Sequence, residues 1–356
     1  MHILIAPDSF KGSLTARQVC DILAQALTAR PGVTVTTLPL SDGGEGFGTC
    51  CVDACKGDIL YTKSVDLYGK PIQAPLYTWG ETALIECAAT CALQEKKDIL
   101  AASSYGVGMQ LQSAIELGFH YLIVGLGGSG MCDGGAGALA ALGVQFYDQN
   151  DCPISHPTGG DLLRIARLEV PTDLQVIVKG LDFTYACDVT NPYSGKNGAA
   201  AVFGPQKGAT PAQVQHLNTG MERLALLLPK DVNALAGAGA AGGLCGGLYG
   251  VLGGTTQSGF NLLADLAGLD SAIAGADLVV TGEGRTDRQT LMGKLPYRVA
   301  LRAKKQGKRC VVISGDSDGT PVGDKVVTLT DKHTPPKMAI ANASALLAEK
   351  ANLLLQ

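Results

Sequence analysis

The sequence predicts an α/β protein of two domains, one of them a Rossmann-like parallel sheet built from both ends of the chain. Near each end, short apolar runs alternate with amphipathic helical stretches, as in parallel βαβ units. Between residues 64 and 275, short β-like runs follow one another more closely, which favours hairpins in a mixed sheet. The length of 356 residues also fits two domains. We therefore assign residues 1–63 and 276–356 to the Rossmann-like domain and residues 64–275 to an inserted mixed α/β domain.

The N-terminal region has the pattern strand, helix, strand. Residues 2–6 form a short apolar run that ends at a proline. Apolar residues then recur at three- and four-residue steps over 14–26, which predicts a helix with Ser13 or Thr15 as its N-cap. Residues 33–40 are rich in β-branched side chains and predict the next strand. This spacing is typical of a parallel βαβ unit.

The C-terminal region repeats the pattern. Residues 277–281, 310–313 and 325–329 are short apolar runs and predict three strands. Helical periodicity covers residues 295–305 between the first two of them, and residues 338–355 predict one last helix. The two ends of the chain would together complete one parallel sheet.

The middle of the chain is less regular. Residues 63–87 alternate in short β-like runs and predict antiparallel hairpins, and a helix is expected near 107–117. Residues 121–125 and 183–187 predict buried strands. Residues 232–264 carry no charge, but they are glycine-rich, poor in large apolar side chains and not flanked by Lys/Arg clusters. A buried helix beside a glycine-rich loop is therefore favoured over a membrane span.

Composition excludes several classes of protein. Glycine accounts for 47 residues, yet there is no Gly-X-Y period and 46% of residues are hydrophobic, which excludes collagen and disorder. The net charge is −4 and no basic block occurs, so we expect no nucleic-acid partner. The N-terminus lacks the features of a secretory signal, and the 11 cysteines include no C-x-x-C pair. We expect reduced, mostly buried thiols, a cytoplasmic location and no membrane association.

Charged residues gather where four predicted strands of the Rossmann-like domain end. The clusters are residues 8–11, 42–45, 283–287 and 314–316. Ligands of open parallel sheets bind beyond the carboxyl ends of the strands, and glycine lets backbone N–H groups approach a phosphate closely. In a chain with only 17% charged residues, this concentration favours a ligand site over ordinary solvated loops.

Two stretches match the pattern G-x-G-x-x-G, at residues 125–130 and 237–242. The first follows a predicted strand, and Asp148 lies further on at the end of an apolar run, as in a dinucleotide-binding fingerprint. The fit is imperfect because the loop continues through residues 131–135 before a helix can begin. The second stretch follows no clear strand. The pattern G-x-x-x-x-G-K-[ST] is missing from the sequence, which excludes a P-loop kinase.

Asp188 comes directly after the predicted strand 183–187, followed by a turn. A carboxylate in this position could take the proton of a substrate hydroxyl. The alternative is that Asp188 only closes its own turn, as aspartates in turns commonly do.

With these residues in view, the sequence resembles the bacterial type I glycerate kinases, the family with the glycerate kinase I fold. The matching blocks occur in the family's order, at residues 5–11, 41–46, 125–129, 133–137, 186–192, 203–208, 237–243 and 281–287, followed by 293–294. The sequence departs from the family pattern at residues 131–132 and in an apparently shorter loop at residues 314–324.

The resemblance implies phosphorylation of D-glycerate by ATP with Mg²⁺, in an active cleft between two α/β domains. Most members make 2-phosphoglycerate, and 3-phosphoglycerate is the alternative product. A homodimer is a further expectation. Two other classes of function stay open at this point. One is an NAD(P)-dependent dehydrogenase that uses Gly125, Gly127 and Gly130 with Asp148, and the other is a sugar-acid sensor without turnover.

Strand-end position and family blocks together suggest roles for individual residues. We predict that Asp188 orients or deprotonates the attacking glycerate hydroxyl, with Asp42 as the competing choice. Lys11 and Arg285 are predicted to bind phosphate oxygens or the glycerate carboxylate, and Glu283 or Asp287 to hold Mg²⁺. The wider predicted site comprises substrate-binding Ser9, Asp42, Asn191 and Lys207, and phosphate- or nucleotide-binding Gly127, Gly128, Ser129, Gly239, Gly242 and Gly284.

Overall fold

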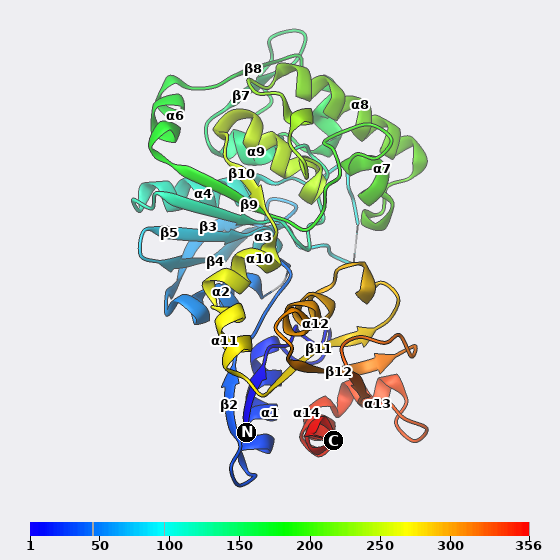
Figure 1. The fold of residues 1–356 in the computed structure, drawn as a ribbon. Coiled ribbons are helices and arrows are strands. Elements are labelled where there is room, and N and C mark those ends of the chain that lie inside the picture. The colour runs from blue at the N-terminus through cyan, green and yellow to red at the C-terminus, as the bar shows by residue number, and fades with distance from the viewer. Residues whose placement is uncertain (45, 96, 356) are drawn as a thin grey trace. The chain divides into compact units, whose positions relative to one another are not determined.

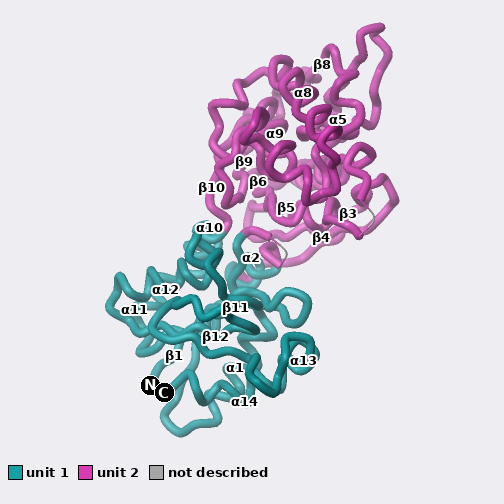
Figure 2. The backbone as a smooth tube through the Cα atoms, turned by 90° about the vertical axis from the view of Figure 1, so that its right-hand side faces the viewer, with its two compact units in different colours: residues 1–42, 49–55, 260–356 teal, residues 43–48, 56–259 magenta. Residues whose placement is uncertain are grey.

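The computed structural model describes residues 1–44, 46–95 and 97–355 (Figure 1). Glu45, which belongs to one of the predicted charged clusters, lies outside the described residues. The chain divides into two compact units (Figure 2). Unit 1 comprises residues 1–42, 49–55 and 260–356, and unit 2 comprises residues 43–48 and 56–259. The domain boundaries predicted from the sequence, and the cleft predicted between the domains, stay predictions.

Unit 1 contains a five-stranded, fully parallel sheet in the order β13-β12-β11-β1-β2. Its strands are β1 (His2–Ile5), β2 (Thr34–Thr37), β11 (Leu278–Thr286), β12 (Arg309–Ser317) and β13 (Lys325–Thr328). The Rossmann-like sheet built from both chain ends is therefore confirmed. In order of appearance the strands run 2-1-3-4-5, so the direction of winding reverses between β1 and β11. That junction is the topological switch point, where ligands of such sheets bind.

Two strands of this sheet are longer than predicted. The sequence suggested strands at residues 277–281 and 310–313 followed by loops, whereas β11 continues to Thr286 and β12 to Ser317. The parallel register carries on past the apolar part, with Glu283 opposite Ser314. The small residue Gly282 permits this, because an added Cβ would lie 2.3 Å from the carbonyl oxygen of Ile313. Two predicted charged loops are thus rigid strand ends.

Helices cover both faces of the unit 1 sheet (Figure 2). On one face lies α1 (Ala16–Thr28), whose buried residues include Val19, Leu23 and Leu27. Thr15 is its N-cap in a capping box with Gln18, which confirms one of the two predicted caps. On the other face lie α11 (Leu269–Gly275) and α12 (Leu295–Lys305), and α12 has the predicted bounds.

The last helix was predicted as one element over residues 338–355, and this was wrong. The structure has α13 (Pro336–Ala341), α14 (Ala343–Lys350) and a 3₁₀ helix (Ala351–Leu355). Asn342 separates the first two with φ −114° and ψ 21°, outside helical geometry. α14 packs against α1 and α13 against β12, and the core with α1 includes Ala339 of α13, Leu347 of α14 and Leu354 of the 3₁₀ helix.

Unit 2 contains a six-stranded mixed sheet in the order β10-β9-β6-β5-β4-β3. Its strands are β3 (Asp58–Val65), β4 (Pro71–Trp79), β5 (Thr82–Glu86), β6 (Tyr121–Gly125), β9 (Asp182–Ala186) and β10 (Thr255–Gln257). The first three pair antiparallel and the others parallel, which confirms the predicted hairpins and buried strands. A separate antiparallel pair is formed by β7 (Gln145–Tyr147) and β8 (Arg167–Glu169).

The remaining helices belong mostly to unit 2. They are α2 (Phe47–Cys55), α3 (Cys87–Cys91), α4 (Tyr105–Glu116), α5 (Ala136–Ala141), α6 (Thr172–Ile177), α7 (Ala199–Phe203), α8 (Pro211–Leu227), α9 (Leu244–Leu252) and α10 (Gly259–Leu266). The buried helix expected within residues 232–264 is α9. Across the described part of the chain, every helix is too short or too polar to span a bilayer.

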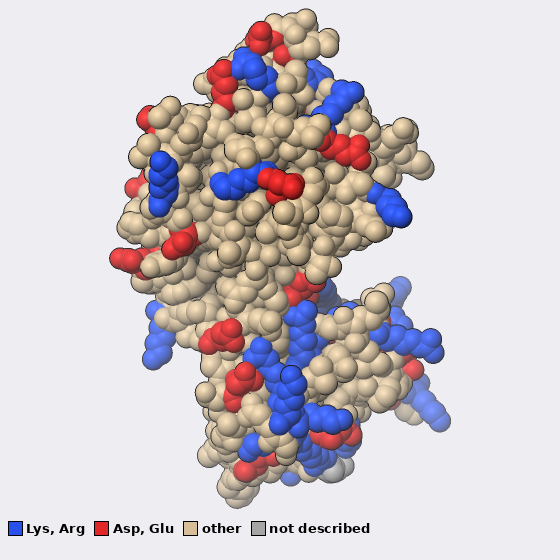
Figure 3. Space-filling model, turned by 45° about the horizontal axis from the view of Figure 1, so that its top comes forward, with Lys and Arg blue, Asp and Glu red and all other residues tan. Residues whose placement is uncertain are grey.

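The surface and the cysteines agree with the composition. On the face drawn in Figure 3, basic and acidic side chains are interspersed and uncharged residues cover most of the surface. All eleven cysteines are free thiols, and eight of them are buried. The expectation that the thiols are mostly buried is confirmed, and their reduced state stays an expectation. They act as small apolar side chains, as buried thiols commonly do.

Candidate active site

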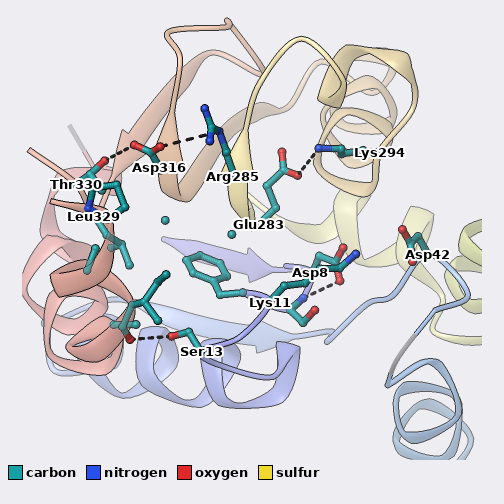
Figure 4. A pocket seen from close by; sticks show the side chains of 18 residues that line it. Asp8, Lys11, Ser13, Asp42, Glu283, Arg285, Lys294, Asp316, Leu329 and Thr330 are labelled. Carbon is teal, nitrogen blue, oxygen red and sulfur yellow. Dashed lines mark hydrogen bonds and ion pairs between the residues drawn. The ribbon is translucent and has the colours of Figure 1, made fainter. Parts of the chain in front are cut away.

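A cavity of about 430 Å³ in unit 1 lies at the carboxyl ends of the parallel strands (Figure 4). Its polar end is formed by Asp8, Lys11, Asp42, Glu283 and Lys294. Its apolar end is formed by Phe10, Leu329, Pro336, Ala339, Ile340 and Ala343. The polar end lies beside the switch point between β1 and β11, and the apolar end lies beyond β13 under α13 and α14.

The loop after β1 positions Lys11 at this cavity. Backbone hydrogen bonds in both directions between Phe10 and Leu14 close the loop, at 2.8 and 3.0 Å, and leave Lys11 exposed at its tip. Gly284 of β11 faces this tip, and a Cβ at Gly284 would lie 3.3 Å from the backbone nitrogen of Lys11. The missing side chain thus lets strand and loop approach closely, which is a local reason for the glycine in this block.

Among the carboxyl groups of the polar end, that of Asp8 has the pKa furthest from its ordinary value. Burial, followed by the negative charge of Asp42, raises its pKa to about 7. Glu283 adds a smaller effect in the same direction, while the N–H of Ser9, donating at 2.7 Å, and the charge of Lys11 oppose it. The protein thus gathers like charges in one partly buried place, an arrangement that a bound cation would relieve.

Glu283 is buried at the end of the same cavity. Its carboxylate accepts a hydrogen bond from Thr290 Oγ1 at 2.7 Å and lies 3.9 Å from Lys294 Nζ. Burial raises the pKa of Glu283, and the Thr290 hydrogen bond and Lys294 counteract the rise. Lys294 also lies 3.4 Å from Asp287, so one ammonium group serves two carboxylates. Asp287 itself is not part of the cavity lining and accepts the Gln289 N–H in its own turn.

Arg285 and Asp316 form the outer rim of the cavity. They are opposite each other in the β11–β12 ladder, with Nε and Oδ2 4.0 Å apart. Thr330 Oγ1 donates to the other oxygen of Asp316 at 2.8 Å and so fixes the carboxylate. At this distance the guanidinium of Arg285, whose side chain is 64% exposed, retains N–H donors for an anion.

The residues of the polar end fit a magnesium ion held jointly with phosphate groups. Among the described residues, no three His, Cys, Asp or Glu side chains are grouped to hold a metal ion by themselves. Mg²⁺ is commonly bound by one or two carboxylates, with substrate phosphates and water completing the shell. Asp8 and Glu283 supply such oxygens beside two cationic side chains, Lys11 and Lys294.

The structure places Ser9, Lys11, Asp42, Glu283, Gly284 and Arg285 of the predicted site together in this cavity. The charged strand-end clusters of the sequence include Asp8 and Asp316, and a family block includes Lys294, but none of the three was assigned a role. The strand-end rule was a sufficient signal for Asp8 and Asp316, whereas Lys294 directly precedes α12. The apolar end had no sequence signal, because α13 was predicted as part of a longer helix.

The other predicted site residues belong to unit 2. Asp188 follows β9, is exposed, and accepts a hydrogen bond from Ser258 Oγ at 2.5 Å. The Asn191 side chain donates through Nδ2 to the carbonyl of Asn197 at 3.0 Å, and the Asn191 backbone carbonyl accepts from the Gly239 N–H at 3.0 Å. Gly242 has φ +66°, and a Cβ there would lie 2.1 Å from the Met131 carbonyl oxygen. Close backbone packing therefore already requires glycine at that position.

Lys207 and the glycine loop after β6 form a separate cluster in unit 2. The buried Lys207 ammonium donates to Ser129 Oγ at 3.0 Å and to the Met131 carbonyl at 2.7 Å. Burial lowers the pKa of Lys207. The Gly127 N–H donates to the Gly43 carbonyl at 3.2 Å, and Gly128 has φ +71°. Internal contacts thus engage the Lys207 ammonium and the Gly127 N–H.

The dinucleotide-binding interpretation of this loop does not fit. In that fingerprint the acidic residue ends a strand of the same sheet. Asp148 instead follows β7, which pairs with β8 in a separate two-stranded sheet, and its carboxylate accepts the N–H groups of Asn150 at 2.8 Å and Cys152 at 3.0 Å. It closes its own turn, so it has no nucleotide-recognition geometry.

The parallel sheet with its charged switch-point cavity, joined to a mixed α/β unit, is the architecture of a small-molecule kinase, and the chain belongs to the glycerate kinase family. The family profile matches residues 3–356. A glycerate kinase of Haemophilus influenzae is 39% identical over 326 residues, which cover 88% of this chain and 86% of the relative. The glycerate 2-kinase of Escherichia coli is 37% identical over 329 residues, with 88% and 85% covered.

A solved structure has the same fold. The crystal structure of a glycerate kinase 2 candidate from Salmonella typhimurium LT2 superposes with a TM-score of 0.85 at 36% identity. The match covers 100% of this chain and 97% of that one. The resemblance drawn from the sequence blocks is therefore confirmed, and with it the mixed α/β fold class.

Proposed function

We propose that this protein transfers the γ-phosphoryl group of ATP to D-glycerate, at the 2-hydroxyl, giving 2-phosphoglycerate. The observation that carries the proposal is the switch-point cavity of unit 1, where cationic side chains meet a cluster of carboxylates in a member of the glycerate kinase family. The name of the Escherichia coli relative supports the 2-hydroxyl. The 3-hydroxyl is the competing position on the same substrate.

Phosphoryl transfer requires positioning and electrostatic stabilisation more than covalent chemistry by the protein. Lys11 and Arg285 serve as the anion-binding groups, and Lys294 is a third cation at the same cavity. Arg285 offers two parallel N–H donors to one phosphate or carboxylate, while the lysines act as point charges. The predicted roles of Lys207, Asn191 and the glycines of unit 2 stay predictions.

Asp8 and Glu283 would hold the magnesium ion that accompanies ATP. A bound Mg²⁺ neutralises charge on the β- and γ-phosphate oxygens during transfer. Glu283 is preferred over Asp287 because it lines the cavity, whereas Asp287 is occupied in its turn and with Lys294. Lys294 Nζ lies 3.9 Å from the Glu283 carboxylate and would help to hold it in place.

Asp188 is proposed to orient the glycerate hydroxyl or take its proton. Its exposed carboxylate at the end of β9 accepts a hydrogen bond from Ser258 Oγ, which holds one oxygen in place. Asp42 remains the competing base, at the polar end of the unit 1 cavity. A cytoplasmic location and a homodimer remain expectations.

Glycerate-dependent ADP formation tests the proposal. The purified protein with MgATP is expected to release ADP when D-glycerate is added, and far less with L-glycerate or without substrate. A sugar-acid sensor would bind D-glycerate in calorimetry but release no ADP, and that result would contradict the proposal. Reduction of NAD(P)⁺ on glycerate addition, without ADP, would instead favour a dehydrogenase.

A further inference from the structure

We propose that the unit 1 cavity binds the whole nucleotide, with the adenine base in the apolar end and the triphosphate in the polar end. The inference rests on the proposed function, because it assigns ATP rather than glycerate to this cavity. The two ends were defined above by their residues, and Figure 4 shows Leu329 on one side of the cavity and Asp8, Asp42 and Lys294 on the other.

Size and polarity argue against glycerate as the occupant of the full cavity. Cavities of roughly 300–1,000 Å³ bind drug-sized or cofactor-sized ligands, and this one measures about 430 Å³. D-Glycerate is a three-carbon acid that is polar over its whole length. It has no group that would gain from the apolar end, whereas a nucleotide joins a flat base to a polyanion.

The apolar end is a wall that the fold leaves uncovered on one side. Phe10, Leu329 and Ala343 are at most 4% exposed and form its base. Ile340 of α13 lines the same end of the cavity and has 53% of its surface exposed. An exposed large aliphatic side chain over a buried apolar floor offers the two sides that a planar purine needs. Burial of such apolar surface against a base would stabilise the complex.

Polar groups border this wall where the edge of a purine would lie. Ser13 Oγ donates to the Ile340 carbonyl at 3.2 Å, and Thr330 Oγ1 donates to Asp316 at 2.8 Å. Each hydroxyl also has acceptor lone pairs, so each can take a hydrogen bond from the exocyclic amine of a base. A few polar groups around an apolar pocket are the usual way to orient a ligand.

The order of the strands sets the direction of the nucleotide. Of the apolar end, Leu329 follows β13 at the sheet edge and Phe10 belongs to the loop after β1, while Arg285 and Asp316 lie on β11 and β12. Lys11 and Lys294 come next, at the switch point between β1 and β11. The base would therefore lie at the sheet edge and the γ-phosphate at the switch point.

Calorimetric titration without glycerate tests this inference. MgATP and magnesium tripolyphosphate are titrated into the wild type, Ile340→Glu and Met338→Glu. Met338 is the matched control, since it lies on the same helix, is 52% exposed and does not line the cavity. A carboxylate at position 340 would lose its hydration against the base, so the Kd for MgATP should rise at least about tenfold. Thermal unfolding of both variants verifies that they are folded.

The expected pattern has three parts. The wild type binds MgATP more tightly than tripolyphosphate, Ile340→Glu loses MgATP affinity but keeps tripolyphosphate affinity within about twofold, and Met338→Glu changes neither. Equal wild-type affinities for the two ligands, or an unchanged MgATP affinity in Ile340→Glu, would overturn the inference.

Failure of the inference differs from failure of the proposed function. If the wild type phosphorylates glycerate while Ile340→Glu binds MgATP normally, the base lies elsewhere and the kinase function stands. If MgATP affinity depends on Ile340 but glycerate is not phosphorylated, the nucleotide site stands and the substrate assignment is wrong.

Discussion

Arg285 and Asp316 lie opposite each other on neighbouring parallel strands, with 4.0 Å between Nε and Oδ2 at the mouth of the unit 1 cavity. The hydrogen bond from Thr330 Oγ1 to Asp316 holds the carboxylate on its far side. Because both partners sit on regular strand extensions, the guanidinium is directed by the sheet rather than by a loop. This relationship supports the proposed role of Arg285 as an anion-binding side chain.

Replacement of Arg285 should therefore reduce catalysis strongly. Loss of one preorganised donor to developing charge typically costs about 100-fold or more in kcat, and we expect this for Arg285→Ala. Arg285→Lys should recover little, because a point charge cannot make two parallel hydrogen bonds. Steady-state kinetics with both substrates varied provide the measurement. Arg302→Ala is a suitable control, since Arg302 pairs with Asp270 and Asn261 away from the cavity. Wild-type kcat and KM in Arg285→Ala would remove the residue from the site.

Lys11 is predicted to contribute to substrate binding as well as to kcat. It lies at the tip of a closed loop and carries an exposed ammonium group into the polar end. We expect Lys11→Ala to raise the KM for ATP or for glycerate, and the substrate affected identifies the anion that it holds. Unchanged KM values together with unchanged kcat would show that Lys11 has no part in the site.

Near-isosteric variants of Asp188 and Asp42 distinguish which of the two residues acts as the general base. If Asp188 is the general base, Asp188→Asn should lower kcat by roughly 100-fold or more with little change in KM. Asp42→Asn should then have the smaller effect on kcat. Ser258→Ala tests the positioning of Asp188, and we expect a smaller loss that Ser258→Thr largely restores. A near-normal kcat in Asp188→Asn would transfer the role to Asp42.

The magnesium requirement distinguishes Glu283 from Asp287. Glu283→Gln should raise the Mg²⁺ concentration needed for half-maximal activity, because one anionic oxygen at the polar end is lost. Asp287→Asn should shift it less, since Asp287 mainly closes a turn and pairs with Lys294. Activity is measured across a magnesium series at fixed free ATP. If neither variant changes the Mg²⁺ concentration needed for half-maximal activity, Glu283 and Asp287 do not hold the ion.

Acid stability provides a check on the segment before α13. Hydrogen bonds from the His333 N–H and the Lys350 ammonium lower the pKa of Asp331 from 3.8 to about 2. A depressed carboxyl pKa stabilises the fold above the unfolded-state value, and this stabilisation is lost as pH falls through the folded-state value. The difference in unfolding free energy between wild type and Asp331→Asn should thus decline between about pH 4 and pH 2. A constant difference over this range, measured by urea unfolding, would contradict the assignment.

Local sequence patterns identified most elements of the fold because the elements are short and strongly periodic. Thr15 with Gln18 is a capping box that can be read directly, and α12 has the predicted bounds. The patterns failed where pairing or packing over a distance decides the outcome. β11 continues through Gly282 because its neighbour β12 accommodates it, and Asn342 breaks the last helix so that two helices can pack differently.

The same limit applies to the candidate site. The charged residues at strand ends predicted the polar end of the cavity. Parallel strands bring their carboxyl ends to one edge of the sheet, so these residues lie together. The apolar end depends on Ile340 of α13 and Leu329 after β13, which no motif connects. Glycine motifs were the least specific signal. Gly242 and Gly239 would place a Cβ 2.1 Å and 2.3 Å from backbone oxygens, so packing explains them without a ligand.

Phosphorus NMR of the product formed from MgATP and D-glycerate tests the central claim most directly. The account predicts an ester phosphorus signal split by a single proton, because the phosphate is attached at the CH of carbon 2. ADP signals should grow in proportion to it. A signal split by two protons would assign the phosphate to carbon 3 and correct the position. No new phosphate ester, with ATP intact and the protein folded, would contradict the account.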